Sequence, residues 1–237
     1  MRLIFLLFSF SVCMQAKAQP LELQGLDYNQ IASYYIQYLK AGSLFVRLQT
    51  KSKKIAILKK AGHLSAAKKV QEDQLRINSS IVAAFRGSFK FCPVYFFYTD
   101  DSKHILKSNI DSVQFLDDKL NYNSQIRPTG QFLIGEFGII KEDTAKYYNG
   151  SAADYEKDST GTLYKNKQYS GTANMSFGAL IIKSPQLVQL PRPFPYYMRT
   201  LSTIPIVRRS HTKVVRRMDY ALNMFYNRTM GLQTFPE

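Results

Sequence analysis

The sequence predicts an α/β fold: a mixed sheet with one parallel βαβ unit, helices packed on it and a C-terminal amphipathic helix. The run Val94 to Tyr98 holds five consecutive apolar or aromatic residues between Pro93 and Asp100-Asp101. Such a run is typical of a central strand buried on both faces, which needs helices to cover it. A strand pattern at 44–49 and a long helical pattern between the two strands complete the βαβ unit. The second half has α+β character, because its later strands are expected to be antiparallel.

The N-terminal segment, residues 1–18, is predicted to be a secretory signal peptide. Arg2 is followed by an apolar stretch at 3–12 and by the cleavage pattern Ala16-Lys17-Ala18. The apolar stretch is about ten residues long, whereas a membrane-spanning helix needs about 20. We therefore expect a soluble protein, exported to the periplasm or the extracellular space after cleavage.

Residues 19–237 are predicted to form one α/β domain. A lipid anchor at Cys13 is the alternative to soluble export, although Val12 stands where a lipobox has a small residue. Cleavage leaves Cys92 as the one cysteine, so the domain has no internal disulfide. Its place at the head of an apolar strand favours a small buried side chain over a nucleophile.

The net charge is +15, and the excess of positive charge is localised. Residues 40–103 carry 13 Lys and Arg against 4 Asp and Glu, and residues 184–237 carry 8 against 2. Residues 104–183 are neutral. This distribution favours an acidic surface or polymer as the partner, such as anionic lipid, lipopolysaccharide or a polyanionic glycan. Export disfavours nucleic acid, and a solvated basic surface without a partner is the alternative.

The first helix should begin after Asp27 and end before Gly42. Asp27 and Gln30 form a capping-box pattern, and Leu26 and Ile31 flank it as a hydrophobic staple. The strand at 44–49 alternates, which predicts that only one of its faces is buried.

Two helices should follow, one over 51–60 and one from Leu64 to about Phe85, separated by Ala61-Gly62-His63. The apolar arc of the second helix is wide enough to contact both a sheet and another helix. Its inner face is predicted to hold Ala67, Val70, Ile77, Ile81 and Phe85.

The later elements follow from shorter patterns. They are a helix at 100–107, strands at 112–116, 132–140 and 175–183, a polar excursion at 141–172 with a hairpin near Leu163-Tyr164, and a final helix capped by Ser210. Gly135 and Gly138 within a strand indicate a bulge or a close backbone approach. The inner stripe of the final helix should be Val215, Met218, Leu222 and Phe225.

Asp100, Asp101 and Glu136 are the candidate catalytic residues. Ligands bind beyond the carboxyl ends of parallel strands, where Asp100 and Asp101 should lie. The alternative for this pair is that one of them caps the helix running to Lys107. Glu136 lies between two glycines, and its partner is either the aspartate pair, as general acid and base or in a divalent-cation site, or a basic side chain.

Four common catalytic or nucleotide-binding motifs do not occur in the chain. The sequence lacks G-x-x-x-x-G-K-[ST], G-x-S-x-G, G-x-G-x-x-G and a C-x-x-C pair. His63, His104 and His211 do not stand at metal-ligand spacing. We predict no cofactor, with a divalent cation as the one possibility left open.

A segment rich in both arginine and tyrosine is the candidate binding site. Its residues are Arg192, Tyr196, Tyr197, Arg199, Arg208, Arg209, Lys213, Arg216 and Arg217. Tyrosine rings and guanidinium groups suit sugars, phosphates or an anionic headgroup layer. The alternative is that this segment packs over the sheet with its tyrosine rings in the core.

The stretch from Phe89 to Tyr98, together with Pro193-Phe194-Pro195-Tyr196-Tyr197, resembles a set of uncharacterised secreted bacterial proteins of similar length. The resemblance implies export and a shared α/β fold, and it implies no activity. Four N-x-[ST] sequons begin at Asn78, Asn149, Asn174 and Asn227.

These observations predict an exported, non-catalytic binding or envelope-associated protein whose basic surface contacts an acidic partner. The alternative is a hydrolase with Asp100, Asp101 and Glu136 at the carboxyl edge of the sheet.

Overall fold

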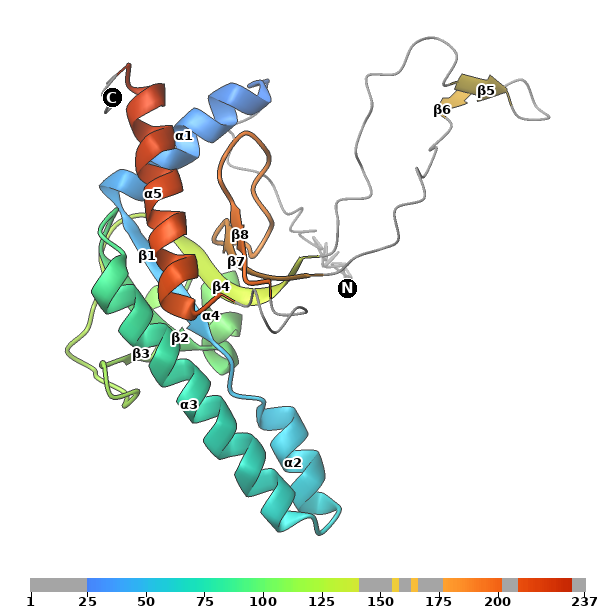
Figure 1. The fold of residues 1–237 in the computed structure, drawn as a ribbon, viewed down its shortest axis with the longest axis vertical. Coiled ribbons are helices and arrows are strands. Elements are labelled where there is room, and N and C mark those ends of the chain that lie inside the picture. The colour runs from blue at the N-terminus through green and yellow to red at the C-terminus, as the bar shows by residue number, and fades with distance from the viewer. Residues whose placement is uncertain (1–24, 141–154, 158–162, 166–176, 202–208, 232–237) are drawn as a thin grey trace, which may run out of the picture.

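A computed structural model describes residues 25–140, 155–157, 163–165, 177–201 and 209–231. Six strands form a mixed sheet in the order β3-β2-β1-β4-β7-β8, which confirms the predicted α/β fold (Figure 1). Their bounds are β1 Ser43–Leu48, β2 Val94–Tyr98, β3 Phe115–Leu116, β4 Phe132–Ile140, β7 Phe177–Lys183 and β8 Tyr197–Arg199.

The predicted βαβ unit is present. Helices α2 (Ser52–Lys60) and α3 (Leu64–Ser88) link β1 to β2, and the two strands run parallel. Strand β4 pairs with the other edge of β1, also in parallel, which the sequence did not predict. β7 and β8 follow as antiparallel strands, and β3 pairs antiparallel with β2. The middle of the sheet is therefore β1 and β4, and the predicted central strand β2 lies one place from the edge.

Strand β1 is buried on both faces, so the prediction of one buried face was wrong. Leu44, Val46 and Leu48 face the helices, and Phe45 enters a second core on the opposite face. The Phe45 ring stacks on Phe132 with the ring centroids 4.2 Å apart. The second core consists of Phe45, Phe97, Ile105, Val113, Phe115, Phe132 and Ile134. Short elements that alternation could not predict cover this face.

Three helices, α1 (Tyr28–Ala41), α3 and α5 (His211–Thr229), contribute buried side chains to the first core. The Asp27–Gln30 capping box is confirmed, with Gln30 N–H donating to Asp27 Oδ1 at 2.8 Å and Asp27 N–H donating to Gln30 Oε1 at 2.9 Å. The Ser210 cap is confirmed, and all four residues of the predicted stripe on α5 are buried.

Two glycines occur where another strand or loop approaches closely. A Cβ on Gly42, which ends α1, would lie 2.2 Å from the backbone oxygen of Gln131. A Cβ on Gly135 would lie 3.3 Å from the Leu44 side chain. The pairing of β4 with both of its neighbours is continuous, so Gly135 marks a close approach rather than a bulge.

The remaining elements are short. The first predicted helix after β2 is a 3₁₀ turn (Thr99–Asp101) followed by α4 (Ser102–Leu106), and a second 3₁₀ turn spans Ile110–Ser112. The hairpin near Leu163-Tyr164 is confirmed as β5 (Tyr155–Lys157) paired with β6 (Leu163–Lys165). Several predictions fall outside the described residues. They are the predicted signal peptide with Cys13, most of the 141–172 excursion, the sequons at Asn149 and Asn174, residues 175–176 and Arg208.

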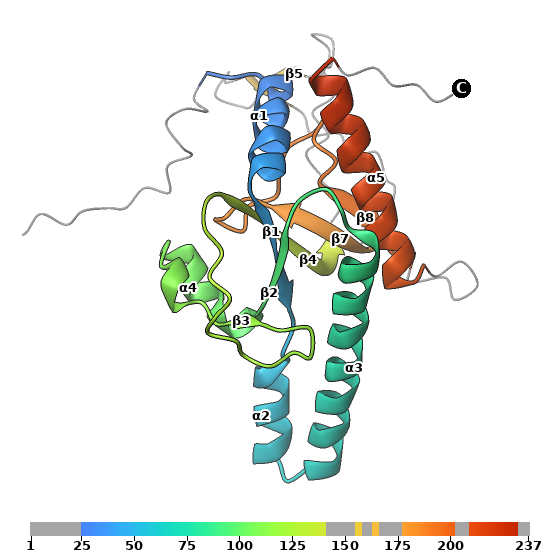
Figure 2. The ribbon, with the colours of Figure 1, turned by 90° about the vertical axis from the view of Figure 1, so that its left-hand side faces the viewer.

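Helix α2 and the first half of α3 project from the sheet as a helical hairpin (Figures 1 and 2). Ile77 was predicted to face inward but is 38% exposed, because this half of α3 has no sheet beneath it. Buried Gln74 and Asn78 lie here instead, and Asn78 donates to the backbone oxygen of Gln49 at 2.9 Å. No helix in the described part of the chain is long and apolar enough to cross a membrane.

Candidate functional site

Asp100 lies beyond the carboxyl end of β2, as predicted. Its Oδ1 accepts hydrogen bonds from Thr50 Oγ1 at 3.1 Å and from Ser52 Oγ at 3.2 Å. Both donors follow β1, so Asp100 links the ends of the two parallel strands. The alternative, that one aspartate caps the next helix, was wrong: Asp101 occupies the N-cap position of α4, but its side chain makes no capping hydrogen bond.

Asp101 is the less satisfied of the two carboxylates. Its Oδ2 is buried and has no hydrogen-bond partner among the described residues. Burial raises the pKa of the Asp101 carboxyl, and the backbone N–H of Gln114 opposes the shift. The pKa of the Tyr122 hydroxyl is also raised, first by burial and then by the negative charges of Asp101 and Asp100. Tyr122 therefore lies within electrostatic reach of both aspartates.

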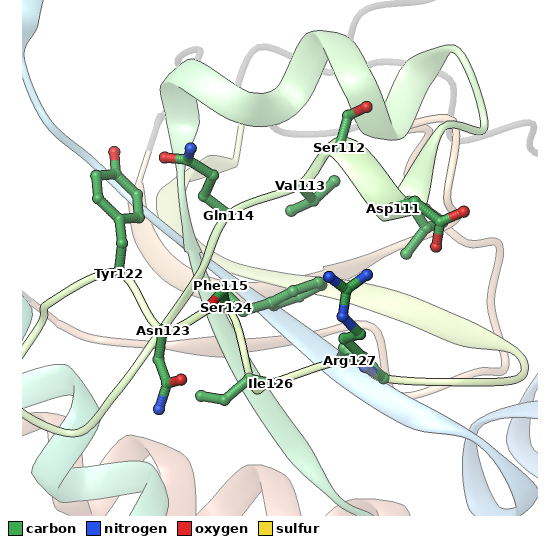
Figure 3. A pocket seen from close by; sticks show the side chains of 12 residues that line it. Asp111, Ser112, Val113, Gln114, Phe115, Tyr122, Asn123, Ser124, Ile126 and Arg127 are labelled. Atoms are coloured by element: carbon green, nitrogen blue, oxygen red, sulfur yellow. The ribbon is translucent and has the colours of Figure 1, made fainter.

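A cavity of about 430 Å³ borders this cluster, between residues 110–115 and 122–128. Figure 3 shows Asp111 and Arg127 at one end of the cavity and Tyr122 with Gln114 at the other. Asp101 does not line the cavity but is linked to its wall through Gln114. The sequence did not indicate this cavity, because no recognisable motif marks the irregular segment that forms it.

Glu136 is held by two cations from neighbouring strands. Arg47 Nη1 on β1 lies 3.1 Å from Glu136 Oε2, and Lys183 Nζ on β7 lies 2.5 Å from Oε1. The Glu136 side chain is 9% exposed and each partner is 21% exposed. The register of the sheet explains the contact, because Arg47 stands directly opposite Glu136. Both carboxylate oxygens of Glu136 are thus in ion pairs. The partner of Glu136 is therefore a basic side chain, as one of the two predictions had it, and not the aspartate pair.

The three candidate carboxylates have different surroundings. Asp100 accepts hydrogen bonds from hydroxyl groups, Asp101 is partly buried and Glu136 is ion-paired. Among the described residues, no three His, Cys, Asp or Glu side chains lie together as a metal site would require. The divalent cation therefore stays a prediction.

Cys92 is buried, which confirms the interpretation as a small core side chain. Burial raises the pKa of its thiol to about 12, so the thiolate needed for nucleophilic attack does not form at neutral pH.

The basic and aromatic candidates meet at the edge strand β8. The Arg199 guanidinium lies over the Phe177 ring, 3.9 Å from its centroid, and the Phe177 and Tyr197 centroids are 5.7 Å apart. Arg192 Nη2 lies 3.3 Å from the Tyr197 hydroxyl oxygen, to which it donates a hydrogen bond. Arg209 donates from Nη1 to the backbone oxygen of Arg199 at 3.1 Å. Residues 192–199 and the start of α5 thus form one continuous group.

The rest of this candidate set divides between surface and core. Lys213, Arg216 and Arg217 are exposed on α5, whereas Tyr196 is only 6% exposed and belongs to the first core. The pKa of Arg209 is lowered, first by burial and then by the positive charge of Arg217. A cavity of about 490 Å³ beside the group is lined by Thr200, Arg209 and His211, among others.

We name six residues of this group, Arg192, Arg199, Arg209, Lys213, Arg216 and Arg217, the basic edge. Within the described ranges, none of the six forms an ion pair with a carboxylate. The basic edge therefore presents uncompensated positive charge to solvent.

No protein family model, curated protein or solved structure matches this chain significantly. The resemblance to secreted bacterial proteins stays a prediction.

Proposed function

We propose that the chain is an exported, non-catalytic protein that binds a polyanion through the basic edge. The observation that carries the proposal is the uncompensated guanidinium array on β8 and α5, beside a cavity that Arg209 lines. A guanidinium group presents several donors in a planar fork that matches phosphate, sulfate and carboxylate oxygens. Anionic lipid headgroups, lipopolysaccharide and polyanionic glycans share these groups.

Two arginines of the basic edge are partly ordered before any ligand arrives. Arg199 stacks on Phe177, and Arg192 is held by the Tyr197 hydroxyl. Side chains that are already ordered lose less conformational entropy when they bind an anion. This feature distinguishes the basic edge from lysines spread over a solvated surface, whose rotamers remain free.

The test uses heparin, a sulfated glycan, as the probe and compares two variants with the parent. One is Arg199→Gln/Arg216→Gln/Arg217→Gln in the basic edge. The matched control is Lys103→Gln/Lys107→Gln/Lys119→Gln, which removes three exposed cations elsewhere. If each exposed ion contact contributes about 0.2–1 kcal/mol, the first variant should weaken heparin binding by roughly three-fold to a hundred-fold.

The control variant should lose much less affinity, and the parent should bind more weakly as salt rises, because exposed charges are screened. Equal losses in the two variants would show that only net charge matters and would overturn the assignment to the basic edge. Circular dichroism of all three proteins checks that the fold is unchanged.

A hydrolase remains the second candidate, because Asp101 is partly hidden beside a cavity and the pKa of its carboxyl is raised. A carboxyl group with a raised pKa suits general acid catalysis. Glu136 is not available for this chemistry without loss of its two ion pairs. Hydrolysis of a generic ester or phosphoester that is abolished by Asp101→Asn would favour the enzyme over the binding protein.

A further inference from the structure

The hairpin formed by α2, the turn at 61–63 and the first half of α3 is weakly tied to the rest of the molecule. Helix α2 buries none of its residues. Of residues 64–77 on α3, only Ala67 and Gln74 are buried. Figures 1 and 2 show the hairpin extending away from the sheet and from α5. Its tip is therefore an outlying surface that the fold itself does not need to cover.

The hairpin is strongly basic. Residues 51–71 contain seven lysines and no Asp or Glu, and all seven lysines are exposed. The next acidic residues along the helix, Glu72 and Asp73, pair with Lys68 and Arg76. The other six lysines have no carboxylate partner among the described residues. They are Lys51, Lys53, Lys54, Lys59, Lys60 and Lys69.

The tip also exposes large aliphatic side chains between these lysines. Ile57 is 68% exposed and Leu64 is 66% exposed. On α2, Lys53, Ile57 and Lys60 are spaced four and three residues apart, so they share one face of the helix. Leu64 begins α3 immediately after the turn. The surface thus carries apolar groups surrounded by long cationic side chains.

We propose that this tip docks on an anionic lipid bilayer, with Ile57 and Leu64 entering the boundary between headgroups and acyl chains. The lysines that surround them contact lipid phosphates, because a lysine stem can lie along apolar surface while its ammonium group reaches the headgroups. Helices that lie on a membrane without crossing it combine lysine or arginine side chains with apolar side chains that enter the interface.

The combination of charge and shape favours a bilayer over other acidic partners. A soluble polyanion would use the lysines but leave Ile57 and Leu64 in water. A partner protein with an apolar pocket would suit one aliphatic side chain, whereas a projecting tip with aliphatic residues on both sides of its turn fits a flat, deformable surface. This proposal concerns a different surface from the basic edge and does not depend on the proposed function.

The first test places a fluorescent reporter at the tip. The chain has no tryptophan, so Ile57→Trp provides a signal from the tip alone. The control is Leu106→Trp, at a residue that is 52% exposed on α4. All variants begin at Gln19, which precedes the first described residue, Gly25. On vesicles of phosphatidylcholine with phosphatidylglycerol, the tryptophan at position 57 should shift its emission to the blue and the one at position 106 should not.

The second test replaces three of the seven lysines of the hairpin in the variant Lys53→Gln/Lys54→Gln/Lys60→Gln. Each lysine lost should lower partitioning onto anionic vesicles about five-fold, and the triple variant by about two orders of magnitude. The Lys103→Gln/Lys107→Gln/Lys119→Gln protein is the matched control and should lose far less. Vesicles of pure phosphatidylcholine should bind neither protein strongly.

Three results would overturn the proposal. One is vesicle binding without a blue shift at position 57, which would place another surface on the lipid. Another is equal loss of vesicle binding in the hairpin and control variants. The third is loss of heparin binding in the hairpin variant when the parent does not bind anionic vesicles, which would identify a soluble polyanion as the ligand. If the basic-edge variant binds heparin as well as the parent, that result counts only against the proposed function. It does not affect the vesicle tests of the hairpin.

Discussion

Replacement of Glu136 by glutamine should destabilise the protein by about 3 kcal/mol. The change keeps the shape of the side chain but leaves Arg47 and Lys183 as two cations without their shared anion. At an effective dielectric constant of about 20, contacts of 3.1 and 2.5 Å correspond to roughly 5–7 kcal/mol each before desolvation is subtracted. Breaking a buried pair costs about 3–5 kcal/mol, and the 21% exposure of both cations favours the lower value.

Thermal unfolding followed by circular dichroism measures this loss. For a chain of this size the midpoint should fall by about 6–12 °C, given about 2–4 °C per kcal/mol. The triple variant Arg47→Met/Glu136→Met/Lys183→Met is the control, because replacement of a whole buried ion network by apolar residues is often neutral or stabilising. A Glu136→Gln protein as stable as the parent would refute the argument that Arg47 and Lys183 need the negative charge of Glu136. A more stable one would indicate a carboxylate retained for function.

Two further variants test other parts of the fold. Gly42→Ala should lower the free energy of unfolding by about 1–3 kcal/mol in urea denaturation, because its Cβ would lie 2.2 Å from the Gln131 backbone oxygen. At about pH 7, Asp101→Asn should raise the thermal midpoint above that of the parent. The difference should disappear as the pH falls toward about 3. Burial raises the pKa of folded Asp101 above 3.8, so its contribution to stability is present at low pH and is lost as pH rises through the folded pKa.

Local patterns in the sequence predicted the helices and the parallel unit well. The Asp27–Gln30 capping box, the Ser210 cap and the inner stripe of α5 each depend on residues within a few positions of one another, and each is confirmed. The burial of β1 could not be predicted in this way. Phe45 contacts Phe132, which is distant in the chain, and only the parallel pairing of β1 with β4 brings the two rings together.

The same distinction applies to the candidate sites. The basic edge was predictable because all six of its residues lie in two short stretches of the sequence, 192–199 and 209–217. The partners of Glu136 were not, since Arg47 and Lys183 are brought to it by sheet register alone. The exposure of Ile57 and Leu64 was likewise hidden, because a helical pattern does not show how far a helix extends beyond the sheet that it covers.

The environments of the charged residues favour binding over catalysis. Two of the three candidate carboxylates have their charge or hydrogen-bonding capacity satisfied, Asp100 by two hydroxyl groups and Glu136 by two cations. The basic residues show the opposite condition, because the basic edge and most lysines of the hairpin have no described carboxylate partner. Uncompensated charge raises the free energy of a folded protein through mutual repulsion, and an anionic partner relieves that cost. Apart from the partly buried Asp101 carboxylate, the charges without a partner among the described residues are mainly exposed cations. A polyanion or an anionic membrane would supply the partner that these cations lack.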